Sequence, residues 1–288
     1  MESQMDFMVL RLIENALAED IGAGDVTTDL LVPEGEKGKG YIVAKEGLVV
    51  AGTDIACRVF EFLDPMMKVD ILAKDGEWVE PGSRVIEASG SMRGLLAGER
   101  TALNFLQRLS GIATYTRRCV KELEGTDVRL VDTRKTTPGL RVLEKYAVRV
   151  GGAHNHRAGL FDGVLIKDNH IAACGGIRQA IERARGAVHH LLKTEIEVSS
   201  LEQVGEAITA GADVVMLDNM DEETIRKAVE IINGRALVEV SGSVKMEDLR
   251  RLAKTGVDII SMGSLTHSAR AVDLSMRISS KVEESANS

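Results

Sequence analysis

The chain has 288 residues, of which 44% are hydrophobic and 28% are charged, and this composition favours a compact α/β protein over a disordered chain. Its formal net charge of -8 argues against nucleic acid or an anionic membrane surface as the main partner. The sequence has no apolar run near the roughly 20 residues of a membrane span. Its three cysteines form no C-x-x-C pair, so we expect a protein of the reducing cytoplasm.

The N-terminal third predicts a helix followed by a small sheet. Apolar residues at helical spacing indicate a helix that starts near residue 6 and ends before Gly22. The polar residues at 25–28 could cap the next element or face a site, and we favour capping. From residue 40 to about 91, short β-type runs alternate with Gly, Pro and Asp turns, so we expect a small sheet domain there.

Leucines at helical spacing predict a further helix that begins after Gly94. Glu99 and Arg100 lie near its start, and by themselves they indicate an exposed ion pair on the helix surface. After Gly111 we expect a second helix over residues 113–123.

From residue 128 onward, strand and helix patterns alternate in six βα units. Short connections with right-handed crossovers give a parallel sheet, either doubly wound or closed into a barrel. A last helix is expected in the run AVDLSMRI. The predicted strands are 128–131, 163–166, 195–198, 213–217, 236–240 and 258–262, and the predicted helices are 141–148, 177–185, 201–210, 222–232 and 246–254.

Charged or small polar residues follow every one of these strands. A barrel gathers all six strand ends on one rim, whereas an open sheet spreads them along an edge, so we favour a barrel. Residues 128–170 also hold eight Lys/Arg against four Asp/Glu in an acidic chain, which predicts an anionic ligand. The residues at the strand ends are Lys135, Lys167, Glu197, Asp218, Ser241, Gly242, Gly263 and Ser264.

The rim combines three chemistries. Its predicted cations recognise carboxylates or phosphates; they are Arg134, Lys135, His156, Arg157 and Lys167. The acids Glu197 and Asp218 are suited to Mg²⁺, and Gly/Ser turns can cradle a phosphate. Together they predict a phosphorylated, Mg²⁺-bound substrate beside an organic acid.

Simpler interpretations stay open at this point. Glu197 and Asp218 could each form a structural salt bridge with a rim lysine, and a Gly-Ser turn after a strand is often only a turn. The pair His154 and His156 has metal-site spacing but no clear third ligand. Two other classes also remain, a Schiff-base lyase with a reactive rim lysine and a binding protein without activity.

Eight segments in order resemble the quinolinate phosphoribosyltransferase family. They are EDIGAGDVTTDLL, GERTALNFLQRLSGIAT, DTRKTTPGLR, GGAHNHRAGLFDGVLIKDNHI, EIEVSS, VVMLDN, EVSG and MGSLTHSA. The resemblance implies an N-terminal α/β sandwich over residues 1–110, with 270–288 packing back on it, and an incomplete TIM-like α/β barrel over 111–269 that carries the site. It also implies a homodimer or higher homo-oligomer with shared active sites, to which the neighbour contributes Arg100.

The resemblance implies transfer of a phosphoribosyl group from phosphoribosyl pyrophosphate to quinolinate with decarboxylation, in de novo NAD biosynthesis. The implied catalytic residues are Lys135, Lys167, Glu197 and Asp218, the two acids facing the ribose hydroxyls and Mg²⁺. The implied substrate-binding residues add Arg100, Thr133, Arg134, His156, Arg157 and a 5′-phosphate cradle of Ser241, Gly242, Gly263 and Ser264. His154 departs from the family pattern and is left unassigned.

Overall fold

The computed structural model describes residues 2–279, with side chains from residue 7 onward, and divides into two compact units. The first unit comprises the chain through Tyr115, the segment Thr137–Gly151 and the chain from Ala269 onward. The second comprises Thr116–Thr136 and Gly152–Ser268. No helix in the described part of the chain is long and apolar enough to cross a membrane.

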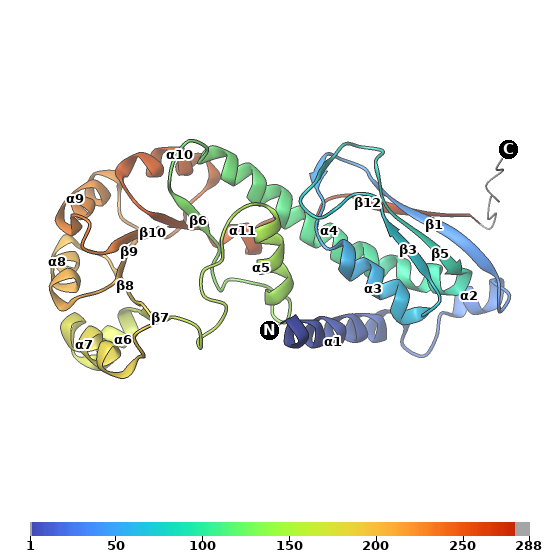
Figure 1. Cartoon of the computed structure of the whole chain (residues 1–288), viewed down its shortest axis with the longest axis horizontal. Coiled ribbons are helices and arrows are strands. Elements are labelled where there is room, and N and C mark those ends of the chain that lie inside the picture. The colour runs from blue at the N-terminus through green and yellow to red at the C-terminus, as the bar shows by residue number, and fades with distance from the viewer. Residues whose placement is uncertain (1, 280–288) are drawn as a thin grey trace. The chain divides into compact units, whose positions relative to one another are not determined.

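The first unit is built on a four-stranded antiparallel sheet of order β12-β1-β5-β3, with β2 and β4 paired separately (Figure 1). Asp25 caps α2, as predicted, by accepting a 3.0 Å bond from the Thr28 backbone N–H. The elements are α1 (Glu2–Ile21), α2 (Val26–Leu31), β1 (Lys37–Ala44), β2 (Leu48–Val49), α3 (Thr53–Leu63), β3 (Lys68–Ile71), β4 (Trp78–Val79), β5 (Arg84–Ser91), α4 (Met92–Glu122), α5 (Arg141–Val150) and β12 (Leu274–Ser279).

Two predictions for this unit were wrong. Helix α3 lies in a region expected to be all β; it buries Ile55, Ala56, Val59 and Phe60 on one side, which is a helical spacing. The run expected to form a last helix is instead strand β12, which pairs antiparallel with β1. Its apolar residues alternate with polar ones, and this period of two matches a strand. Residues 280–288 lie outside the described chain.

One continuous helix, α4, replaces the two helices expected on either side of Gly111. Gly111 serves a close backbone contact, because a Cβ at this position would lie 2.1 Å from the carbonyl oxygen of Arg270. The chain that leads into β12 therefore crosses α4 at a point where only glycine leaves room.

Gly111→Ala is expected to lower the free energy of unfolding by about 1–3 kcal/mol, the usual cost of overpacking, although alanine is the better helix former. Gly205→Ala in α8 is the matched control, because a Cβ there meets nothing within 4 Å. The control should gain up to about 1 kcal/mol from helix propensity. Denaturant titrations of both variants measure the difference, and an equal gain at both positions would contradict the packing explanation.

Segment Thr137–Gly151, expected within the barrel domain, belongs to the first unit. Two polar contacts hold α5 there. The Tyr146 hydroxyl donates a 2.7 Å bond to Asp75, and the buried carboxylate of Glu144 pairs with Arg108 at 2.7 Å. Periodicity identifies such a helix but does not reveal which unit it packs against.

The second unit is a six-stranded parallel sheet of order β6-β11-β10-β9-β8-β7, flanked by helices (Figure 1). Strands β6 and β7 are the two ends of this order, so the sheet is an incomplete TIM-like barrel, which confirms the predicted fold class. The elements are β6 (Arg129–Val131), β7 (Val164–Ile166), α6 (Asp168–Cys174), α7 (Ile177–Ala187), β8 (Thr194–Val198), α8 (Leu201–Ala210), β9 (Val214–Asp218), α9 (Glu222–Ile232), β10 (Leu237–Ser241), η1 (Met246–Asp248), α10 (Leu249–Leu252), η2 (Ala253–Thr255), β11 (Ile259–Ser261) and α11 (Ser264–His267).

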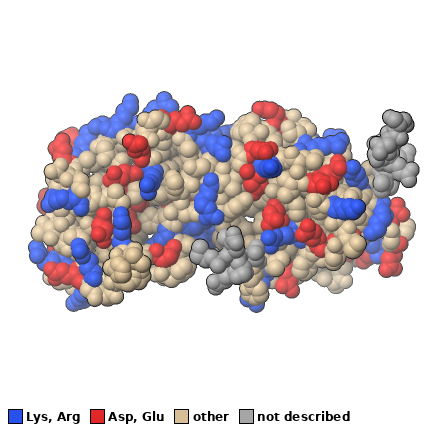
Figure 2. Space-filling view, in the orientation of Figure 1, with Lys and Arg blue, Asp and Glu red and all other residues tan. Residues whose placement is uncertain are grey.

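Lysine and arginine side chains alternate with acidic ones on the face shown in Figure 2. That face carries no continuous basic surface of the kind that nucleic acid requires.

Candidate active site

The parallel register places the predicted strand-end residues next to one another. Ile166 pairs with Ile196, so Lys167 and Glu197 follow on adjacent strands, and the Lys167 ammonium forms an ion pair with the Glu197 carboxylate. This contact agrees with the salt-bridge interpretation for Glu197. The lysine side chain is nevertheless 44% exposed, so it remains accessible to a ligand.

Asp218 ends β9 directly opposite Ser241 of β10. Its carboxylate accepts a 3.0 Å bond from the Asn219 side-chain amide, and in the described chain it has no lysine partner. The structural salt bridge considered for Asp218 is therefore absent from these residues. A half-buried carboxylate at a strand end remains available for a hydroxyl or a cation.

The glycine after β10 is required by its surroundings. Gly242 has φ of 98°, and a Cβ there would lie 2.4 Å from Asn219 Oδ1 and 2.8 Å from the Asn219 backbone nitrogen. Asn219 also has a positive φ, of 53°. The turns after β9 and β10 thus pack closely against each other, and only glycine fits at position 242.

The loop after β6 is anchored to the turn after β11. The Thr266 hydroxyl donates a 2.8 Å bond to the Lys135 carbonyl, and the Lys135 N–H donates a 3.0 Å bond to the Thr133 hydroxyl. A Cβ on Gly263 would lie 3.0 Å from Lys135 Cδ. Nearby, the buried Ser264 hydroxyl has no hydrogen-bond partner among the described residues. The main chain of Lys135 is fixed while its side chain is exposed.

Arg134 and Arg157 converge. Burial, and next the charge of Arg134, lower the pKa of Arg157 from its ordinary value. One guanidinium N–H of Arg157 donates a 3.1 Å bond to the Gly163 carbonyl, which anchors the side chain. An anion bound between two such cations would relieve their repulsion, so this pair is a candidate for carboxylate binding.

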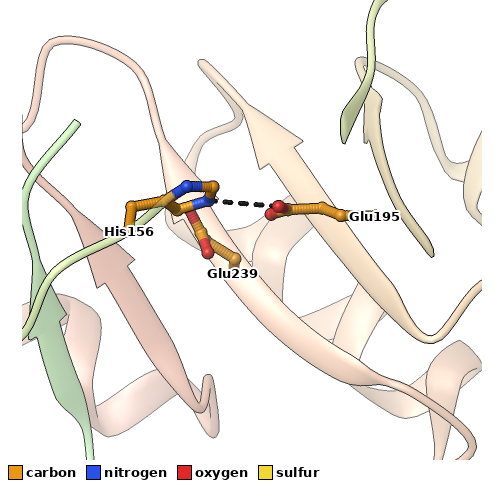
Figure 3. A group of neighbouring side chains, drawn as sticks. All are labelled: His156, Glu195 and Glu239. Carbon is orange, nitrogen blue, oxygen red and sulfur yellow. Dashed lines mark ion pairs between the residues drawn. The ribbon is translucent and has the colours of Figure 1, made fainter. Parts of the chain in front are cut away.

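His156 differs from the cations with which it was grouped. Its Nδ1 accepts a 2.8 Å bond from the Arg157 backbone N–H, so the ring proton is assigned to Nε2 and the ring is neutral. Nε2 lies 3.1 Å from the Glu195 carboxylate and 3.6 Å from that of Glu239 (Figure 3). The ring thus faces these two acids of the barrel strands.

The sequence analysis missed these two acids. Glu195 and Glu239 are buried, with 8% and 2% of their surface exposed. Burial, and next the charge of the neighbouring Glu195, raise the pKa of Glu239 to about 8. The sequence did indicate Glu195, because it lies two residues before Glu197 in β8, and side chains two residues apart face the same side of a strand.

Glu239→Gln is expected to stabilise the protein increasingly as the pH rises from about 4.5 to about 8. In this window the unfolded chain has released the Glu239 proton while the folded protein retains it, so the wild type loses stability with rising pH. Glutamine has no such proton. Chemical denaturation of both proteins at several pH values measures the effect, with the exposed Glu230→Gln as control. A difference that does not vary with pH would contradict the assigned burial of a neutral carboxyl.

Arg100 is the predicted site residue that belongs to the first unit. It lies exposed on α4 and forms no hydrogen bond or ion pair with described residues, so the ion pair expected with Glu99 is absent there. His154 is also exposed, and its backbone forms an isolated bridge with Val131. The other predicted site residues all lie in the second unit.

The fold is of the TIM-like barrel type, and cationic, acidic and Gly/Ser residues gather at the carboxyl ends of its strands, where barrels of this type carry their active sites. The family models of the quinolinate phosphoribosyl transferase N-terminal and C-terminal domains match residues 25–110 and 112–277. The chain therefore belongs to the quinolinate phosphoribosyltransferase family.

Individual relatives agree over nearly the full length. The probable nicotinate-nucleotide pyrophosphorylase [carboxylating] of Bacillus subtilis is 45% identical, with 93% of this chain and 92% of that protein covered. The corresponding Methanocaldococcus jannaschii protein is also 45% identical, with 93% and 96% covered. The crystal structure of NadC from Streptococcus pyogenes superposes with a TM-score of 0.91 at 42% identity, covering 97% of this chain and 98% of that one.

Proposed function

We propose that this enzyme transfers the phosphoribosyl group of phosphoribosyl pyrophosphate to the ring nitrogen of quinolinate. Loss of the 2-carboxylate gives nicotinate mononucleotide, pyrophosphate and CO₂, the reaction implied for the family in de novo NAD biosynthesis. The observations that carry the proposal are the electrostatic effect of Arg134 on Arg157 and the Lys167–Glu197 ion pair, all at residues that follow or end strands of the barrel. Such a rim suits a dicarboxylate next to a phosphorylated sugar.

The main task of the protein in this mechanism is to position two anionic substrates. Arg134 and Arg157 bind the quinolinate carboxylates, and Lys135 and Lys167 supply further positive charge. As the carbon–oxygen bond to pyrophosphate breaks, positive charge develops on the ribose, and Glu197 and Asp218 stabilise it. The ring nitrogen becomes cationic on attack and stabilises the carbanion left at C2 when CO₂ departs, and a proton from water then binds to C2.

The same two acids are the proposed Mg²⁺ ligands. Both offer carboxylate oxygens at strand ends and both are only half-buried, which suits an ion that keeps several waters. When bound, Mg²⁺ neutralises charge on the pyrophosphate leaving group. The turns at Ser241, Gly242, Gly263 and Ser264 are the proposed cradle for the 5′-phosphate, to which the unpartnered Ser264 hydroxyl can donate.

We further propose a cytoplasmic homodimer or higher homo-oligomer, in which Arg100 reaches the site of a neighbouring subunit. The supporting observations are that Arg100 is exposed and that Val26, Leu30 and Leu31 in the same unit are 72%, 79% and 75% exposed. Light scattering tests the assembly. Mixing an Arg100→Ala protein with a Lys135→Ala protein tests the sharing, because only shared sites regain activity on mixing; no recovery would contradict it.

The lysines do not favour a Schiff-base lyase. Lys167 is an ion-paired ammonium, and Lys135 is exposed, whereas such a nucleophile needs a desolvated neutral amine. Borohydride trapping of a covalent adduct at either lysine, without release of pyrophosphate, would favour the lyase instead.

An assay with purified protein tests the proposed function. Quinolinate or nicotinate is supplied with phosphoribosyl pyrophosphate and Mg²⁺, and pyrophosphate and CO₂ are followed together. Release of both products from quinolinate supports the proposal. Binding heat without either product would indicate a binding protein and reject it.

A further inference from the structure

The barrel interior holds two carboxyl groups that the proposed reaction does not use. Glu195 and Glu239 come from β8 and β10, and both are more than nine-tenths buried. One oxygen of each, Oε1, is buried without a hydrogen-bond partner in the described chain. Both carboxyls face the same ring nitrogen, Nε2 of His156, at 3.1 Å for Glu195 and 3.6 Å for Glu239.

The His156 ring connects this pair to the substrate-binding segment. Its Nε2–H faces Glu195 Oε2 at 3.1 Å, while Nδ1 accepts the backbone N–H of Arg157 at 2.8 Å. The buried carboxylate of Asp132 accepts the His156 backbone N–H at 2.9 Å and the Asn155 amide at 2.6 Å. The turn that presents Arg157 is therefore fixed through its main chain and through the ring.

The ring can hold Arg157 only in one state. A doubly protonated imidazolium would carry a proton on Nδ1, which could then no longer accept from Arg157. The neutral Nε2–H tautomer satisfies both neighbours, because Nε2–H donates to Glu195 while Nδ1 accepts from Arg157.

We propose that Glu195 and Glu239 are positioning residues whose carboxyls flank Nε2 of His156, hold the ring as the neutral Nε2–H tautomer and thereby fix the main chain of Arg157 at the quinolinate site. The inference rests on the proposed function only where it names quinolinate. The state of the ring is a separate physical claim.

Nitrogen-15 NMR of histidine-labelled wild-type protein near neutral pH tests that claim without substrate. The His156 signal is identified as the one missing from the His156→Gln protein. We expect one protonated and one unprotonated ring nitrogen, with the proton on Nε2. A doubly protonated ring or an Nδ1–H tautomer would overturn the proposal.

The three facing ligand atoms of His156, Glu195 and Glu239 lie within 4.8 Å of one another, a spacing that would also suit a metal ion. Elemental analysis of the wild-type and Glu239→Gln proteins separates the two cases. No bound metal in either protein agrees with a proton on Nε2. Stoichiometric zinc or manganese that is lost in the variant would overturn it.

Kinetics test the positioning role. Glu195→Ala removes the acceptor of Nε2–H, and we expect the KM for quinolinate to rise roughly 10-fold to 100-fold, as for loss of a charge-assisted hydrogen bond, with a smaller change in kcat. Glu195→Gln retains an acceptor and should recover most of the loss. Thr194→Val, a buried isosteric change one residue earlier on β8, controls for general disturbance of the strand.

A KM unchanged in Glu195→Ala, or raised equally in the Thr194→Val control, would contradict the role. Wild-type protein that shows the expected tautomer but releases neither pyrophosphate nor CO₂ would overturn the proposed function, and the assignment of the ring state would stand.

Discussion

Arg157→Ala is expected to lower kcat/KM for quinolinate on the order of 30-fold to several thousand-fold, which corresponds to about 2–5 kcal/mol of transition-state binding. The side chain is partly buried, repels Arg134 electrostatically and is anchored by the Gly163 carbonyl, so its removal takes away one of the two proposed carboxylate-binding arginines. Steady-state kinetics with quinolinate as the varied substrate measure the loss. Lys135→Ala is expected to fall in the same range because it removes a rim charge.

Arg178→Ala is the matched control for this experiment. Arg178 is an exposed arginine on α7 of the same unit, so its loss changes the net charge equally and should leave kcat/KM within about twofold. Turnover near the wild-type value in both Arg157→Ala and Lys135→Ala would reject the carboxylate-binding assignment of the rim.

Asp218→Ala is expected to lower kcat roughly 100-fold and to raise the Mg²⁺ concentration for half-maximal activity by about tenfold or more. The carboxylate lies opposite Ser241 at the strand ends, where it faces the proposed metal and the developing charge on the ribose. Mg²⁺ titrations of turnover measure both effects. Glu230→Ala removes an exposed acid of α9, the next helix, and serves as control. An unchanged Mg²⁺ requirement in Asp218→Ala would count against a metal-binding role.

The barrel could be predicted from the sequence because the apolar residues of each βα unit repeat with the periods of a strand and a helix. All six predicted strands and four of the five predicted helices are confirmed to within a few residues; the fifth, 246–254, consists of η1, α10 and η2. Elements whose conformation depends on contacts with residues far away in the sequence were not predicted correctly. Strand β12 depends on pairing with β1. Gly111 suggests a helix end, but it occurs inside α4 because the carbonyl of Arg270 lies too close for any larger residue. Local pattern carries no information about such contacts.

The site divides in the same way. Residues that follow strands could be placed on one rim because parallel strands share their direction, and Lys167 does meet Glu197. Position after a strand end could not identify Glu195 and Glu239, because these two residues are far apart in sequence and lie within strands. Residue type likewise suggested that His156 was a cation, whereas its hydrogen bonds assign the neutral form.

The most direct test of the central claim uses quinolinate labelled with ¹³C in its 2-carboxylate. With phosphoribosyl pyrophosphate and Mg²⁺, we predict labelled CO₂, pyrophosphate and nicotinate mononucleotide in equal amounts, with no label left in the nucleotide. Pyrophosphate release without labelled CO₂, or retention of the label in the nucleotide product, would contradict the account.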